Sequence, residues 1–253
     1  MRIFRHGLLI SALVLSLISV GRAKEKTELF RVGECLRYTV RWEMVPAGTA
    51  TFRVRDILQI AHMPAWHFEL EVRSNQYIDL LYKIRDRYEG LIDIRLTQSL
   101  LYRKTQSGKD KKQVVVAFDR ESGTAVYSNY GEKRPPLPIL PDTVDPLSAF
   151  YKMRTMDFDS EKTISFSVTD GKKKFMQTVE VIDRQTLVSD DGKSWDTYLI
   201  VPSAAHFSGV FAKSDDPGIN IWVTADERKI PVRIEVKVFI GHVVFDLAGI
   251  EPL

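Results

Sequence analysis

A single cysteine, Cys35, is present among the 253 residues of the chain, so an internal disulfide is excluded. The fold must therefore be held together by burial of apolar side chains, and the chain is long enough for one domain to form such a core. A lone thiol also argues against dithiol redox catalysis. Arg37, two positions away, would favour the thiolate of Cys35, but a small, half-buried strand residue is the simpler interpretation.

The sequence also lacks the short motifs that bind metals or nucleotides or carry out nucleophilic catalysis. It has no CxxC, HExxH, GxSxG or GxGxxG and no phosphate-binding glycine loop. The histidines at positions 62, 67, 206 and 242 are not spaced to aim two imidazoles at one metal ion. Residues 157–168 begin like a calcium loop, but Lys162 replaces the required glycine and Val168 the final glutamate. We expect no metal, no cofactor and no enzymatic activity.

Long apolar segments are missing as well, apart from an uncharged stretch over residues 7–20. This stretch follows the basic residues Arg2 and Arg5 and precedes the small residue Ala23, the order found in secretory signal peptides. It is shorter than the about 20 residues that a helix needs to cross a bilayer. We predict a signal peptide over residues 1–23, export to the periplasm and no transmembrane span after cleavage, with an uncleaved anchor as the alternative.

An excess of one charge is absent from the predicted mature chain. The whole sequence has 36 Lys and Arg against 33 Asp and Glu, but Arg2, Arg5 and Arg22 belong to the predicted signal peptide. Without these three arginines the two signs balance. The basic isoelectric point of the whole chain is therefore no reason to expect a nucleic-acid partner.

What the sequence does contain is alternation of apolar and polar residues, the pattern of half-buried antiparallel strands. In residues 66–73, for example, Trp66, Phe68, Leu70 and Val72 alternate with polar side chains. Similar segments recur along most of the chain. We predict a mainly β protein, an antiparallel meander that forms a large curved sheet, a sandwich or a half-barrel.

The alternation stops at a connector over residues 131–159. Prolines at positions 135, 136, 138 and 141 prevent regular strand pairing there. Asp145 followed by Pro146 is typical of a helix start, which predicts one short helix near residues 146–155. The connector separates two β-rich halves, about residues 30–130 and 160–253, of a single domain spanning residues 24–253.

Strand registers can be predicted for two parts of the sheet. In the last three strands the core face should carry Ile230, Val232, Ile234, Val236 and Val238. Trp222 then lies across from Arg233 on the outer face. In the first hairpin, pairing Tyr38 with Val54 places Arg37 directly opposite Arg55.

Four arginines, at positions 37, 41, 53 and 55, share the polar face of that first hairpin. Like charges directly opposite each other destabilise a sheet, so acids should lie nearby. Glu69 and Glu71 of the following strand are one source, and an external anion is the other: the phosphate of a lipid or lipopolysaccharide, an acidic glycan, or an acidic partner protein. The candidate ligand-binding residues are Arg37, Arg41, Arg53, Arg55, Trp222 and Arg233.

Asp86 is the one acid that alternation places on an apolar face, together with Ile84 and Tyr88. We expect it to be buried or to face a cavity. It is either a structural acid held by an arginine or a backbone amide, or one of two catalytic carboxylates in a glycan hydrolase. Asp145 and Asp226 are more simply explained as a helix cap and a turn residue.

Four segments together are similar to those of a known family. They are Gly33 and Glu34 with Leu36 and Tyr38, AGTA at 47–50, DPLSAFY at 145–151, and IWVTADERKIPVRIEVKVFIGHVVFDL at 221–247. Over about residues 30–250 the chain resembles the bacterial envelope family called domain-of-unknown-function family 3108. The resemblance implies a secreted, β-rich protein and assigns no functional residue.

The long antiparallel sheets of that family look similar to the half-barrels of lipoprotein carriers, a likeness of fold only. If the two halves enclose an apolar cavity as such carriers do, a ligand would lie on the inward side. Our main hypothesis is a non-enzymatic periplasmic protein that binds a lipid, lipopolysaccharide or acidic glycan as a carrier or assembly factor. The alternatives are a structural or partner-binding envelope protein without a small ligand, and a glycan hydrolase.

Overall fold

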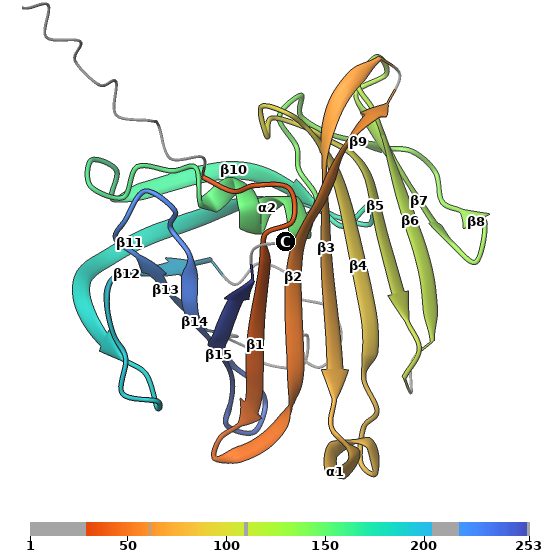
Figure 1. Cartoon of the computed structure of the whole chain (residues 1–253). Helices are drawn as coiled ribbons and strands as arrows, with labels where there is room; N and C mark the ends of the chain where they lie inside the picture. Colours follow the sequence, from red (N-terminus) through yellow and green to blue (C-terminus); the bar gives the residue numbers. More distant parts are fainter. Residues whose placement is uncertain (1–28, 61, 109–110, 204–217, 252–253) are drawn as a thin grey trace, which may run out of the picture.

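The structure of the protein is a computed structural model that describes residues 29–60, 62–108, 111–203 and 218–251 (Figure 1). The predicted signal peptide, residues 1–23, lies outside the described residues. The first half contains β1 (Cys35–Trp42), β2 (Val45–Ile60), β3 (Met63–Ser74), α1 (Gln76–Asp79), β4 (Arg85–Asp93), β5 (Ser99–Gln106), β6 (Lys112–Asp119), β7 (Thr124–Asn129), β8 (Glu132–Lys133) and β9 (Leu137–Pro138). The rest contains α2 (Pro146–Met153), β10 (Thr163–Thr169), β11 (Lys174–Val188), β12 (Ser194–Pro202), β13 (Ile219–Thr224), β14 (Pro231–Lys237) and β15 (His242–Glu251).

The strands form one large antiparallel sheet, as predicted. Its order is β10-β11-β12-β13-β14-β15-β1-β2-β3-β4-β5-β6-β7-β8, with β9 paired to β7. The two halves are joined because β1 pairs with β15, so that Leu36 lies across from Ile250 and Val40 from Phe245. Among the described strands, β10 and β8 are the edges, and no pairing between them closes the sheet into a barrel. The sheet curves strongly around α2 (Figure 1).

Strict alternation gives the sheet two different faces. The inner face carries the core, in which Leu36, Tyr38, Val54 and Phe68 are almost completely buried. The opposite, outer face carries most of the charged side chains of the same strands. Because successive side chains of a strand point to opposite sides, the sequence pattern alone decides which residues share a face.

The register of the last three strands agrees with the prediction. Trp222 pairs with Arg233, and Asn220 pairs with Glu235. All five residues predicted for the core face are buried: Ile230, Val232, Ile234, Val236 and Val238.

The predicted register of the first hairpin is wrong. Trp42 pairs with Val45, so Glu43 and Met44 form a two-residue turn in which Glu43 has φ 51, and a bulge follows between Val40 and Arg41. Arg37 therefore lies across from Thr51 and not from Arg55. We expected a longer loop ending at Gly48. The difference is an even number of residues, so every side chain keeps its predicted face.

The connector contains the predicted helix, but the expectation that its prolines prevent strand pairing is wrong, because the short strands β8 and β9 pair with β7. Asp145 is the N-cap of α2 and accepts hydrogen bonds from the backbone N–H groups of Leu147 and Ser148, both at 2.9 Å, and Pro146 occupies the first turn. The helix packs on the inner face, where Tyr151 stacks on Phe68 with ring centroids 3.7 Å apart. The helix fills the inner face in front of β3 and β4.

A buried ion pair ties the connector to both halves of the sheet. Arg154, directly after α2, is completely buried and donates to both carboxylate oxygens of Glu34, at 2.6 and 3.2 Å. Its guanidinium also donates to the carbonyl oxygens of Leu29 and Arg228. Each of the three guanidinium nitrogens thus has an acceptor, which favours the tolerance of such a buried pair.

Removal of one member of this pair should destabilise the fold strongly. We expect Glu34→Ala to lower the free energy of unfolding by about 3–5 kcal/mol, because it leaves the Arg154 charge buried without a partner. Urea unfolding followed by circular dichroism would measure this. The double variant Glu34→Ala with Arg154→Met should cost less than Glu34→Ala alone, and a loss under about 1 kcal/mol in the single variant would contradict the assignment.

Candidate functional site

The arginines predicted as ligand-binding residues do share the outer face, but acids of the same chain accompany each of them. Arg53 on β2 lies 3.1 Å from Glu69 and 3.5 Å from Glu71 of β3, and Arg55 lies 3.8 Å from Glu69. Arg87 of β4 approaches Glu69 from the other side, at 2.6 Å. The sequence-based expectation that Glu69 and Glu71 compensate the arginines is confirmed for Arg53 and Arg55.

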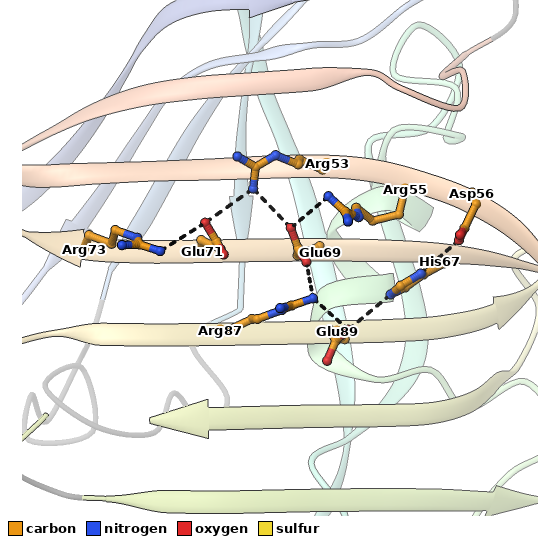
Figure 2. Close-up of polar contacts among 9 residues, drawn as sticks. All are labelled: Arg53, Arg55, Asp56, His67, Glu69, Glu71, Arg73, Arg87 and Glu89. Atoms are coloured by element: carbon orange, nitrogen blue, oxygen red, sulfur yellow. Dashed lines mark hydrogen bonds and ion pairs between the residues drawn. The ribbon is translucent and has the colours of Figure 1, made fainter. Parts of the chain in front are cut away.

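These residues belong to a continuous network across β2, β3 and β4, which we call the charge ladder (Figure 2). Its members are Arg53, Arg55, Asp56, His67, Glu69, Glu71, Arg73, Arg87 and Glu89. His67 connects its far end, since one ring nitrogen lies 2.9 Å from Asp56 and the other 3.4 Å from Glu89. Glu69 is its centre, because this carboxylate is only 2% exposed and faces three guanidiniums.

The electrostatics of the charge ladder keep its central arginine charged. Burial alone would lower the pKa of Arg53, but the neighbouring Cys35, Glu69 and Glu71 raise it above its usual range. Cys35 is buried directly across from Arg53 in the β1–β2 pairing.

The other predicted arginines find their acids near the end of the chain. Arg37 lies 2.5 Å from Glu251, and Arg41 lies 3.2 Å from Asp246, both on β15. Arg233 donates to the same Asp246, so Arg41 and Arg233 converge on one carboxylate. Trp222 is half-buried across from Arg233. The structure therefore places the five candidate arginines in three groups, around Glu69, Asp246 and Glu251, and the sixth candidate, Trp222, is uncharged.

The outer face is hollowed over one part of the charge ladder. An open depression of about 470 Å³ lies over β3, β4 and β5. Its lining is Glu71, Arg73, Arg85, Asp86, Arg87, Glu89, Thr105 and Ser107. Since acids and arginines alternate in this lining, an external anion would have to displace carboxylates of the chain.

The charge ladder should contribute to stability mainly through Glu69. Glu69→Ala leaves Arg53, Arg55 and Arg87 around a buried position, and we expect a loss of about 3 kcal/mol in the free energy of unfolding. Arg37→Ala removes one exposed ion pair with Glu251 and should cost no more than about 1 kcal/mol. Urea unfolding of the two variants checks the order, and equal losses would contradict it.

The inner face shows a boundary between apolar and polar side chains on the same three strands. Leu70 and Val72 of β3 are half-buried there. Their cross-strand partners on β4 are Tyr88 and Asp86, which in turn pair with Lys104 and Gln106 of β5. We call these six residues the inner patch.

The polar half of the inner patch is held by internal contacts. The Asp86 carboxylate accepts hydrogen bonds from the Tyr88 hydroxyl at 3.1 Å and from Nε2 of Gln106 at 2.7 Å. The ammonium of Lys104 lies over the Tyr88 ring, 5.6 Å from its centroid. Oε1 of Gln106 is buried and accepts no hydrogen bond from a described residue. Such an acceptor is costly unless something donates to it.

Asp86 faces the inner side, as alternation predicted, and is half-buried. A tyrosine hydroxyl and an amide hold it, where we expected an arginine or a backbone amide. The nearest acids on β3 and β4, Glu71 and Glu89, point to the outer face and belong to the charge ladder. These two acids therefore do not form a carboxylate pair with Asp86.

The inner patch has a signature in the pH dependence of stability. Burial lowers the pKa of Lys104 from 10.5 to about 8. The unfolded chain therefore binds more protons than the folded chain between those values, so stability rises with pH in that window. We expect the free energy of unfolding to rise from pH 8 to about 9.5 and this rise to be smaller in Lys104→Met, in which burial still lowers the pKa of Lys152. Tyrosine ionisation acts only near pH 10 and above. Identical slopes in both proteins would contradict the prediction.

Several of these features were missed by sequence reasoning. Glu34 and Arg154 lie far apart in the chain, and no local pattern connects them.

The described residues contain no group of three side chains suited to hold a metal ion. In the described part of the chain, no helix is both long enough and apolar enough to span a bilayer.

Together these features define an open, β-barrel-like antiparallel sheet with a helix on its inner face. The chain belongs to the family described as "Protein of unknown function (DUF3108)", which matches residues 37–248 and confirms the resemblance noted above. No curated protein matches the chain.

One solved structure of low identity shows a similar fold, and two others match with lower scores. A β-barrel-like protein of domain of unknown function DUF1849 from Brucella abortus has a TM-score of 0.57 at 10% identity, over 87% of this chain and 97% of that chain. A protein from Parabacteroides distasonis, provisionally described as a lipoprotein, has a TM-score of 0.34 at 10% identity, over 88% and 98%. An exported protein, also provisionally so described, from Bacteroides fragilis has a TM-score of 0.33 at 10% identity, over 87% and 96%.

Proposed function

We propose that this protein is exported to the periplasm and binds an amphiphilic envelope component, a lipid or lipopolysaccharide, on its inner face, as a carrier or assembly factor without enzymatic activity. The predicted signal peptide supports export. The observation that carries the binding proposal is the inner patch, where apolar and polar side chains of neighbouring strands meet on the concave side of an open sheet.

The chemistry of the inner patch suits a molecule with an acyl chain and a polar head. Leu70 and Val72 offer apolar surface that the core leaves partly uncovered. Lys104 and Gln106, two strands away, add a buried cation and a buried acceptor oxygen to which no described residue donates. An anionic head group beside Lys104 would stabilise its charged form and offset the burial that lowers its pKa. Apolar walls with few polar groups are usual in ligand sites.

The arginines of the outer face support a structural or partner-binding role for that face. Arg53, Arg55 and Arg233 are engaged with acids of the chain, so an acidic glycan would gain little by displacing them. This favours the structural, partner-binding alternative for the outer face over a small-ligand site. Under that alternative, Arg37→Ala with Arg55→Ala weakens folding or the complex with another envelope protein and leaves lipid binding unchanged.

The glycan hydrolase alternative depends on Asp86. Its test is Asp86→Asn in the native host, which keeps the shape of the side chain and removes the charge. Envelope phenotypes that remain intact in this variant exclude the hydrolase.

Native mass spectrometry of the mature protein purified from its own periplasm tests the main proposal. We expect a bound molecule that contains an acyl chain, and at least a tenfold loss of occupancy in Val72→Glu, since a charge on the apolar half of the inner patch opposes an acyl chain. Arg73→Glu, the next residue on the same strand, points to the outer face and serves as the matched control. Protein that emerges empty and takes up neither lipid nor lipopolysaccharide overturns the proposal.

A further inference from the structure

The most exposed large apolar side chains gather at one end of the sheet. They lie on the β1–β2 turn, on α1 and the residues that follow it, and on the β14–β15 turn, all at the lower end in Figure 1. The residues are Met44, Tyr77, Leu80, Leu81, Phe239 and Ile240, with exposed fractions from 64% for Ile240 to 87% for Met44. Turns normally carry polar residues, so this concentration requires a reason.

Hydrogen bonds join the three segments into one surface, which we call the apolar platform. The Trp42 indole donates a hydrogen bond to the carbonyl oxygen of Ile240 at 2.7 Å. The backbone N–H of Glu43 donates to the carbonyl oxygen of His242 at 2.8 Å. On the other side, the backbone N–H of Asn75, the N-cap of α1, donates to the carbonyl oxygen of Ala47 at 2.8 Å. The β1–β2 turn is thus fastened to both of its neighbours.

The turns hold these side chains outward. The backbone of Glu43 (φ 51) and Gly241 (φ 72) is left-handed, which closes both hairpins in very few residues. The apolar residues at such tips have no core beside them to pack into. Three separate protruding tips suit insertion into a soft layer better than docking to a rigid partner, which uses flat or complementary surfaces.

The charges around the apolar platform favour an anionic layer. Two nearby acids have partners within the chain: Asp79 forms an ion pair with Arg85 at 2.6 Å, and the Glu43 carboxylate accepts a hydrogen bond from the backbone N–H of His242 at 2.6 Å. Lys83, behind α1, and Lys237, behind the β14–β15 turn, are exposed and form no ion pair with a described residue. Lysines behind apolar tips are attracted to anionic lipid head groups, and Tyr77 and Trp42 suit the boundary between head groups and acyl chains.

We propose that the apolar platform docks the protein on an anionic lipid bilayer by inserting the side chains of its three segments into the interfacial layer. The inner patch lies on the strands that lead to this end, since β3 ends at Ser74, two residues after Val72 and just before α1, and β4 starts at Arg85, after the short segment that follows α1. Docking would place the concave face beside the membrane. It does not require that the inner patch holds a ligand.

Cosedimentation of the mature protein with phosphatidylglycerol-containing vesicles tests docking. We expect Leu80→Glu with Leu81→Glu to reduce the bound fraction at least tenfold, and Lys83→Glu with Lys237→Glu to reduce binding to anionic vesicles more than to phosphatidylcholine vesicles. Ile57→Glu with Ile94→Glu is the matched control, because these exposed residues lie at the opposite end, by the β2–β3 hairpin. The control should bind like the unmodified protein.

Three outcomes would overturn the proposal: unmodified protein that stays in the supernatant, a Leu80 and Leu81 variant that sediments normally, or a platform buried in a dimer without vesicles. Native mass spectrometry of the same variant separates this proposal from the proposed function. A docking-deficient variant that still carries its acyl ligand contradicts neither. Unmodified protein that docks but is always empty supports docking and contradicts the carrier proposal.

Discussion

The buried ion pair between Glu34 and Arg154 is the contact on which the arrangement of the molecule depends. Glu34 precedes the first strand, Arg154 ends the connector helix, and Arg228, whose carbonyl oxygen accepts from Arg154, belongs to the second half. One completely buried guanidinium therefore joins three distant parts of the chain. A charge in this position is tolerated only when its donors are satisfied, so the pair also selects the position of α2 on the inner face.

The two faces of the sheet carry different kinds of side chains. On the outer face, Glu69 collects Arg53, Arg55 and Arg87, and the charges are largely neutralised within the chain. On the inner face, α2 fills only part of the surface, and β3 to β5 keep apolar and polar side chains that the core does not use completely. The apolar platform lies where those strands end. The outer-face arginines thus form ion pairs within the chain, and the proposed binding rests on the inner patch and the apolar platform instead.

The alternation of side chains correctly predicted the core face of residues 230–238 and the inward position of Asp86. The helix start at Asp145 and Pro146 was also readable, because capping is a local interaction. The register of the first hairpin could not be predicted from the sequence. A turn at Glu43 and a bulge after Val40 changed which residues pair, but each side chain stayed on its predicted face of the sheet. Alternation has a period of two and cannot distinguish registers that differ by an even number.

The sequence by itself determined the class of fold and the two faces of the sheet, because both follow from periodicity. Its segments resembled the family, and it offered Glu69 and Glu71 as one of two possible partners of the arginines because these residues lie close to them along the chain. Only the tertiary structure decided that Arg37 meets Glu251, that Arg41 and Arg233 share Asp246, and that three separate apolar tips form one platform. Arg37 meets Glu251, and Arg41 reaches the Asp246 that Arg233 also contacts, because β1 pairs with β15. Pairing of the first strand with the last depends on closure of the whole chain, which no local pattern encodes.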